Sequence, residues 1–150
     1  MNPDPWLDRW LPLLRERSAG APVVCQDLLA PFPAGPGSTG AVVASLSLHY
    51  FPWPATQALM DRIRATLRPG GLLLCRLNST NDHHFGASGH PKLEDSYYLV
   101  SGASKRFFDA GSVARLFALG WRTLSTEEQV TGKYGSPKAL WEVVLEKAGA

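Results

Sequence analysis

The sequence places its most reactive side chains at the end of an apolar run. Residues 45–51 read Ser-Leu-Ser-Leu-His-Tyr-Phe. His49 is the side chain of this segment that can take up a proton near neutral pH, and Tyr50 can orient a bound substrate. The alternative is an aromatic cluster of Tyr50, Phe51 and Trp53 that packs against the following helix. We favour packing for Phe51 and Trp53, and leave both interpretations of His49 open.

A second group of polar side chains follows the next apolar run. Asn78, Asp82, His83 and His84 stand there and can recognise a polar substrate. Two adjacent histidines beside an acid also suggest a metal. Neighbouring side chains of an extended segment diverge, however, and the spacing fixes no third ligand. We therefore expect no metal site, and a solvated loop is the favoured alternative for this group.

Two tyrosines and two basic residues further along the chain can cover a pocket as a lid. They are Tyr97, Tyr98, Lys105 and Arg106. Tyr97 is accordingly a candidate substrate contact, although an aromatic pair beside basic residues is as often plain packing. The stretch 78–102 is polar and rich in His and Gly, and we predict that it is irregular. A loop of that length in a compact domain is usually functional or mobile.

Hydrophobic periodicity predicts the elements that position these residues. The predicted helices are 5–17, 54–67 and 107–119, and the predicted strands are 23–26, 40–48, 72–77, 121–130 and 139–146. Asp4 and Asp109 are the expected N-caps of the first and last helices. Pro12 argues for a kink in the first helix or for a later start. The stretch 30–40 is too rich in Pro and Gly to be anything but a loop.

The order of these elements indicates an α/β fold. Strand 40–48 is apolar or small at nearly every position, as in parallel sheets that are covered on both faces. Strand, helix, tight turn and strand from 40 to 77 form a βαβ unit, which is right-handed in about 98% of cases. The 150 residues fit one domain, which we divide into an N-terminal helical segment at 1–20 and an α/β core at 21–150.

Composition excludes several classes of protein. Fifteen Lys and Arg against thirteen Asp and Glu give a formal charge of +2, and the basic residues form no run that could follow phosphates, so nucleic acid is not an expected partner. No apolar stretch approaches the roughly 20 residues of a membrane span. The sequence MNPDPWLDRW carries acids where a signal peptide is basic and apolar, so we expect a cytoplasmic protein. Cys25 and Cys75 lie in apolar runs and are expected to be buried thiols.

The turn Leu67-Arg68-Pro69-Gly70-Gly71 is the most specific part of a larger arrangement. Three parts precede this turn along the chain: Asp27-Leu28, the strand that ends at 45–51, and an amphipathic helix. This arrangement resembles the second half of a class I S-adenosylmethionine (SAM)-dependent methyltransferase. In that family the turn leads into the fifth strand, and an antiparallel hairpin, here 121–146, closes the sheet. The resemblance implies an incomplete Rossmann-like sheet, mainly parallel with a C-terminal antiparallel hairpin.

The resemblance also implies roles for individual residues. SAM would be the cofactor and a small molecule the methyl acceptor. The Asp27 carboxylate would accept a hydrogen bond from the adenine amine, with the Leu28 amide near the ring. A role of Asp27 as a turn residue is left open as an equal alternative. Ser45, Leu46 and Ser47 would face the methionine part of the cofactor. His49 and Tyr50 would be catalytic, while the acceptor would contact five residues: Phe51, Asn78, Asp82, His83 and Tyr97.

The sequence departs from the family at the cofactor loop. The family has a Gly-x-Gly turn after its first strand, and no such loop followed by a helix occurs in this chain. Gly35-Pro36-Gly37 does not replace it, because its proline removes a donor and no helix follows. We therefore expect weak or absent SAM binding. Two hypotheses remain, a small-molecule methyltransferase and a catalytically inactive binding or dimerisation module with the same ancestry.

The missing unit also bears on the sheet and its association. We predict the strand order 23–26, 42–48, 72–77, 139–146, 121–130, with the first two parallel. Loss of a βαβ unit leaves Val24 and Val43 without one covering layer and leaves the 23–26 strand as an unprotected edge. A homodimer through that flank is expected, or otherwise a marginally stable monomer.

Overall fold

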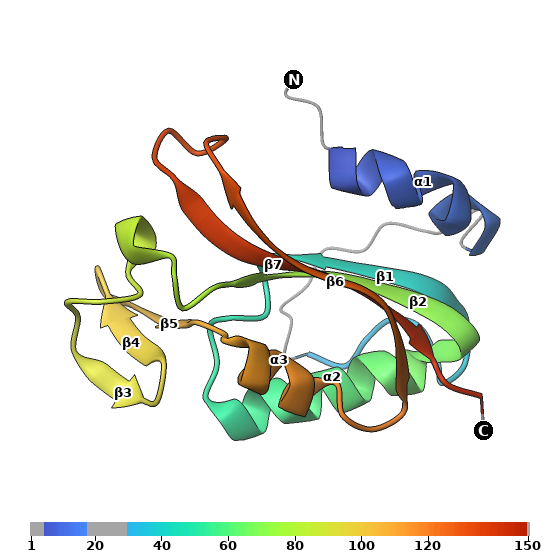
Figure 1. Ribbon diagram of the computed structural model, residues 1–150. Coiled ribbons are helices and arrows are strands. Elements are labelled where there is room, and N and C mark those ends of the chain that lie inside the picture. Colours follow the sequence, from blue (N-terminus) through green and yellow to red (C-terminus); the bar gives the residue numbers. More distant parts are fainter. Residues whose placement is uncertain (1–4, 18–29, 150) are drawn as a thin grey trace.

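The computed structural model describes residues 5–17 and 30–149 (Figure 1). Its elements are α1 (Pro5–Arg17), β1 (Thr39–Ser45), α2 (Trp53–Thr66), β2 (Leu67–Asn78), the 3-10 helix η1 (His83–Phe85), β3 (Lys92–Glu94), β4 (Tyr97–Val100), β5 (Ala103–Arg106), α3 (Ala110–Leu116), β6 (Trp121–Thr131) and β7 (Lys138–Lys147). Figure 1 shows α1 on one face of the main sheet and α2 and α3 on the other.

The main sheet has the order β1-β2-β7-β6, as the sequence predicts for these four strands. β1 and β2 are parallel, with Val42 opposite Leu73, whereas β7 is antiparallel to both β2 and β6. The prediction of a mainly parallel sheet with a closing antiparallel hairpin is therefore confirmed only in part, because the described sheet is mixed, with one parallel and two antiparallel strand pairs. Within the closing hairpin only β7 runs against β2, whereas β6 runs in the same direction as β2. The predicted partner 23–26 lies outside the described residues.

The central strand β2 is buried on both faces because its side chains alternate between two apolar clusters. Leu72 and Leu74 pack toward α1, together with Val144 of β7. Leu73, Cys75 and Leu77 pack toward α2 and α3 in the larger cluster. All five β2 side chains are fully buried, which confirms that Cys75 is a buried free thiol. A strand covered on both faces reads as a continuous apolar run, as it does here.

The Arg-Pro-Gly-Gly turn forms a bulge at the start of β2. Thr39 pairs with Leu67 and Ala41 pairs with Leu72, so four residues of β2 protrude between consecutive pairs. Gly70 has a φ of +77°. A Cβ at Gly71 would lie 2.8 Å from the Arg68 carbonyl oxygen. Both glycines are therefore required by the backbone of this turn.

The helices differ from prediction mainly at their ends. α1 spans the predicted 5–17 with Pro12 inside it, and α2 begins and ends one residue early. α3 is shorter than 107–119, because Phe107 and Phe108 are buried before its N-cap. Asp109 is that N-cap, as predicted, and accepts a 2.7 Å hydrogen bond from the Ser112 N–H. The predicted N-cap Asp4 lies outside the described residues.

The segment 78–102 is not irregular, which corrects the sequence analysis. With Ala103–Arg106 it builds a small antiparallel sheet in the order β3-β4-β5. Ser101 and Gly102, with φ of +51° and +83°, form the tight turn between β4 and β5. Positive φ at both central residues is the pattern of a two-residue hairpin turn. Strands of three or four residues are too short to give a periodic pattern in the sequence.

Candidate functional site

The candidate site lies where β1 and β2 end, at one edge of the main sheet. Parallel strands bring their carboxyl ends to the same edge, which is where open α/β sheets bind ligands. Ser45 closes β1 and is exposed, whereas Leu46 and Ser47 are half-buried. Leu46 has a φ of +54°, and its N–H donates to the Arg76 carbonyl at 3.0 Å. The chain therefore turns sharply here and leads His49 under the small sheet.

His49 is held in the interior as a neutral imidazole. Its side chain is 3% exposed, and its Nδ1 has no hydrogen-bond partner. Burial lowers the pKa of His49 to about 3, with further contributions from the nearby Lys138 and Lys105 ammonium groups. A base of this pKa accepts a proton poorly at pH 7. The structure therefore argues against the predicted uptake of a proton near neutral pH.

Tyr50 lies at the surface beside His49. Its ring centroid is 4.2 Å from that of His49, and the residue is 44% exposed. The Tyr50 carbonyl accepts hydrogen bonds from the Tyr97 hydroxyl at 3.2 Å and the Ser104 hydroxyl at 2.9 Å. The backbone of Tyr50 is thus fixed by the small sheet, while its ring stays open to a ligand.

Phe51 and Trp53 support the packing interpretation that the sequence favours for them. Both are partly buried against the larger apolar cluster, and the Trp53 ring lies 6.4 Å from that of Phe108. The Phe51 carbonyl accepts a 3.2 Å hydrogen bond from the Thr56 hydroxyl, which fixes the entry into α2. A substrate contact through Phe51 is accordingly less favoured than its packing role.

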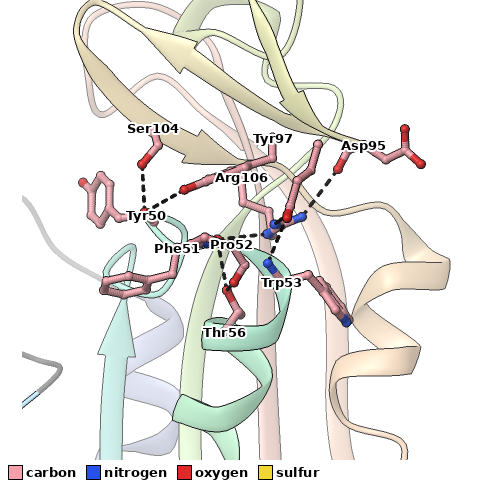
Figure 2. A network of polar contacts seen from close by, with 10 residues as sticks. Tyr50, Phe51, Pro52, Trp53, Thr56, Asp95, Tyr97, Ser104 and Arg106 are labelled. Atoms are coloured by element: carbon pink, nitrogen blue, oxygen red, sulfur yellow. Dashed lines mark hydrogen bonds and ion pairs between the residues drawn. The ribbon is translucent and has the colours of Figure 1, made fainter.

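Arg106 ties the small sheet to the segment before α2 (Figure 2). Its guanidinium donates to the Phe51 and Asp95 carbonyls, each at 3.4 Å, and forms an ion pair with Glu94. It also lies 4.6 Å from the centre of the Tyr97 ring. Since Arg106 is 4% exposed, these contacts are shielded from water.

Glu94 completes this junction and was not found from the sequence. Its carboxylate accepts a 3.1 Å hydrogen bond from the Trp53 N–H. That bond, and secondly the Arg106 guanidinium, hold the pKa of Glu94 below its usual value. Tyr97 is 5% exposed with its hydroxyl engaged, so it acts as an anchor of the predicted lid. Glu94 stands on a three-residue strand that leaves no sequence pattern.

A buried polar cluster lies at the end of β2. The Lys138 ammonium donates to the Asp82 carboxylate at 2.6 Å and to the Asn78 side-chain oxygen at 2.9 Å. The second Asp82 oxygen accepts the Ala139 N–H at 3.1 Å. Asn78 and Asp82 are 2% and 1% exposed. Their predicted substrate contacts are therefore replaced by contacts within the protein, with Lys138 as the partner that the sequence analysis missed.

The remaining predicted residues fall outside this cluster. His83 and His84 are exposed, and His83 Nδ1 lies 3.1 Å from the Ser88 hydroxyl. Among residues 5–17 and 30–149, no three His, Cys, Asp or Glu side chains gather as a metal would require. Asp27, Leu28, Cys25 and the predicted strand 23–26 lie outside the described residues. In the described part no helix has the length and apolar character needed to cross a membrane.

The helices near this edge do not fit the anionic end of SAM. α2 begins Pro52-Trp53-Pro54, where the prolines lack N–H groups and the Trp53 N–H is bonded to Glu94. The first turn of α3 is closed by the Asp109 carboxylate. In the Gly35-Pro36-Gly37 loop the N–H of Gly37 is also occupied, because it donates to the Ala65 carbonyl at 2.9 Å. Neither helix therefore offers the open, glycine-rich first turn that holds an anionic group.

Comparison with known proteins finds solved structures that share this architecture. No family model matches the sequence, and no curated protein matches it. A SAM-dependent methyltransferase from Methanosarcina mazei has a TM-score of 0.69 at 13% identity, over 83% of this chain and 66% of its own. The Burkholderia thailandensis 1,6-didemethyltoxoflavin-N1-methyltransferase, solved with 1,6-didemethyltoxoflavin and S-adenosylhomocysteine, has a TM-score of 0.64 at 17% identity, over 93% and 56%.

The fold also occurs in a protein named for another reaction. The [4+2]-cyclase SpnF matches with a TM-score of 0.59 at 14% identity, over 85% of this chain and 56% of its own. This chain thus spans between about half and two thirds of the length of these structures. Together with the order β1-β2-β7-β6 and the mixed pairing of the closing hairpin, the matches show that the chain has the fold of class I SAM-dependent methyltransferases.

Proposed function

We propose that this chain is a SAM-dependent methyltransferase-like protein that acts on a small-molecule acceptor and, in isolation, holds the cofactor weakly. The observation that carries the proposal is the edge where β1 and β2 end, in a methyltransferase fold. There the exposed Tyr50 ring stands beside neutral His49, and the small sheet is fixed next to both. The 1,6-didemethyltoxoflavin bound in the Burkholderia structure supports an acceptor of small size.

The chain's own residues supply binding and orientation in this proposal. The Tyr50 ring offers a surface on which a flat acceptor can stack. His49 would act as a neutral hydrogen-bonding group, because its lowered pKa makes it a poor base. Asp27, Leu28 and residues 45–47 remain the proposed cofactor contacts. SAM would supply an electrophilic methyl group, and the described residues do not fit its anionic end.

Isothermal titration with SAM and S-adenosylhomocysteine tests the proposal. We expect dissociation constants well above the micromolar range, and Asp27→Ala should weaken the interaction further. A low-micromolar constant, equivalent to about −8 kcal/mol, would refute weak binding. An unchanged affinity in Asp27→Ala would show that this carboxylate is only a turn residue.

A catalytically inactive methyltransferase-like module is the second candidate. The absence of a Gly-x-Gly loop in the sequence favours it. It predicts that millimolar S-adenosylhomocysteine leaves the amide resonances of residues 45–51 unchanged, whereas the first candidate predicts shifts confined to this edge. The nuclear magnetic resonance titration therefore separates the two.

A further inference from the structure

The strand β1 is an open edge of the main sheet. In the order β1-β2-β7-β6 it pairs with β2 alone among the described residues. Its sequence, Thr-Gly-Ala-Val-Val-Ala-Ser, contains no charged residue and no proline. From Ala41 to Ser45 its register with β2 is regular, so no bulge turns this part of the edge away from a further strand. An edge of this kind is a template for the addition of another strand.

The opposite edge strand, β6, is protected against such pairing. Its register with β7 shifts between Thr123 and Ser125, which marks a bulge. It also carries three charged side chains, Arg122, Glu127 and Glu128. Bulges and charged side chains are the usual means by which native proteins protect an edge strand. Because residues 41–45 of β1 have neither, β1 is the edge of the main sheet to which a strand can be added.

One hydrogen bond shows which backbone groups of β1 face outward. The Leu46 N–H donates to the Arg76 carbonyl of β2 at 3.0 Å. Successive residues of a strand direct their N–H and C=O groups to opposite sides. The backbone groups of Val42 and Ala44 therefore also face β2, whereas those of residues 41, 43 and 45 face away from it. Within the described part of the chain, no group forms a hydrogen bond with these outward N–H and C=O groups.

The outward groups are arranged symmetrically about Val43, so a second copy of β1 can satisfy them. A two-fold axis at Val43 places this residue opposite its own copy and places Ala41 opposite Ser45. In antiparallel strands each such pair exchanges two N–H···O bonds, so every outward group is used. Val43 is 50% exposed and lies opposite Leu74 on the face covered by α1. The two Val43 side chains would meet there and extend the apolar cluster across the axis.

We propose that two copies of this chain associate through antiparallel β1 strands, with the two-fold axis at Val43, so that their main sheets form one continuous sheet. Since β1 carries no charge, the two strands meet without repulsion between like charges. The arrangement gives the homodimer expected from the sequence a contact strand and a register. It does not rest on the proposed function, because it requires neither the cofactor nor a methyl acceptor.

Nuclear magnetic resonance on a mixed sample of the full chain tests this register. Isotope-labelled and unlabelled chains are unfolded in urea and refolded together, and an isotope-filtered experiment then detects contacts between copies alone. We expect a contact between the α-protons of Val42 and Ala44 of different copies, whose Cα atoms would lie about 4.5 Å apart. Three results would each overturn the proposal: no contact between copies along β1, contacts between copies along β6 instead, or pairing of Val42 with residues 23–26 of its own chain.

A proline at position 41 tests the same pairing through the stability of the dimer. Ala41→Pro removes one outward N–H from each copy and keeps the bonds to β2, and edge strands accept proline at such positions. Sedimentation equilibrium should show a dissociation constant raised about 30-fold, for two lost hydrogen bonds. Val43→Thr keeps the β-branched shape and every backbone donor, so its dimer should persist. An unchanged dissociation constant in Ala41→Pro would overturn the proposal, and the mixed sample decides the matter if that variant does not fold.

Discussion

The buried neutral imidazole of His49 predicts a specific acid sensitivity. Unfolding exposes this side chain, so its pKa rises from about 3 in the folded protein to the ordinary value of roughly 6.5. Between these values the unfolded chain binds a proton that the folded protein does not. Stability contributed by neutral His49 is therefore present above pH 6.5 and is lost as the pH falls.

The size of the loss follows from the two pKa values. Each pH unit in this window removes about 1.4 kcal/mol from the free energy of unfolding, so the step from pH 7 to pH 5 removes about 2 kcal/mol through His49. His49→Gln lacks this titration. Its stability should fall by about 2 kcal/mol less over the same step, whatever the pH-independent cost of the substitution.

Urea denaturation of both proteins at pH 7 and pH 5 measures this difference directly. His84→Phe is the matched control, since it removes an exposed histidine and leaves the burial of His49 in place. It should retain the wild-type loss on acidification. If His49→Gln loses as much stability as the wild type between the two pH values, the burial of a neutral imidazole is refuted.

Three further perturbations test other parts of the structure. Asp82→Ala leaves the buried Lys138 ammonium uncompensated, so urea denaturation should show a loss of about 3–5 kcal/mol; a loss below about 1 kcal/mol would contradict the pairing. Arg106→Met removes the contacts to Glu94 and to two carbonyls, so amide exchange should accelerate in β4 and β5 but not in β2; equal exchange in both proteins would contradict this. Val43 is 50% exposed on β1, so Val43→Lys should shift the proposed homodimer toward monomer in sedimentation equilibrium at micromolar concentration; a monodisperse wild-type monomer would exclude that dimer.

The main sheet was predictable because its strands carry strong patterns. Residues 72–77 are almost wholly apolar, and the order of the four described strands followed from the resemblance and from the turn before them. The small sheet was not predictable by periodicity. β3 to β5 are held by a local two-residue turn at Ser101-Gly102 and by the Arg106 junction, and that junction is a contact between distant parts of the sequence.

The position of the candidate site was predicted correctly, but the roles of its residues were predicted less well. Residues 45–51 do lie at the sheet edge, whereas the lowered pKa of His49 depends first on its burial and then on Lys138 and Lys105, which are far away in the sequence. Asn78 and Asp82 were chosen as polar residues after a strand, and that pattern is the same whether their partner is a ligand or Lys138. Lysine is rarely buried, so nothing in the sequence marks Lys138 as that partner.

Among the described residues, the reach of α1 accounts for the position of a cavity between this helix and the β6–β7 hairpin. α1 has 13 residues, about 20 Å of helix, and its buried side chains meet Leu72, Leu74 and Val144. One step further along the same face come Arg76 and Glu142, and the Trp6 ring of α1 lies 4.4 Å from the Arg76 guanidinium. Arg76 and Glu142 pair with each other, and this leaves open space beneath the hairpin. The pair can lie under this partial cover because each charge is satisfied by its partner on the neighbouring strand.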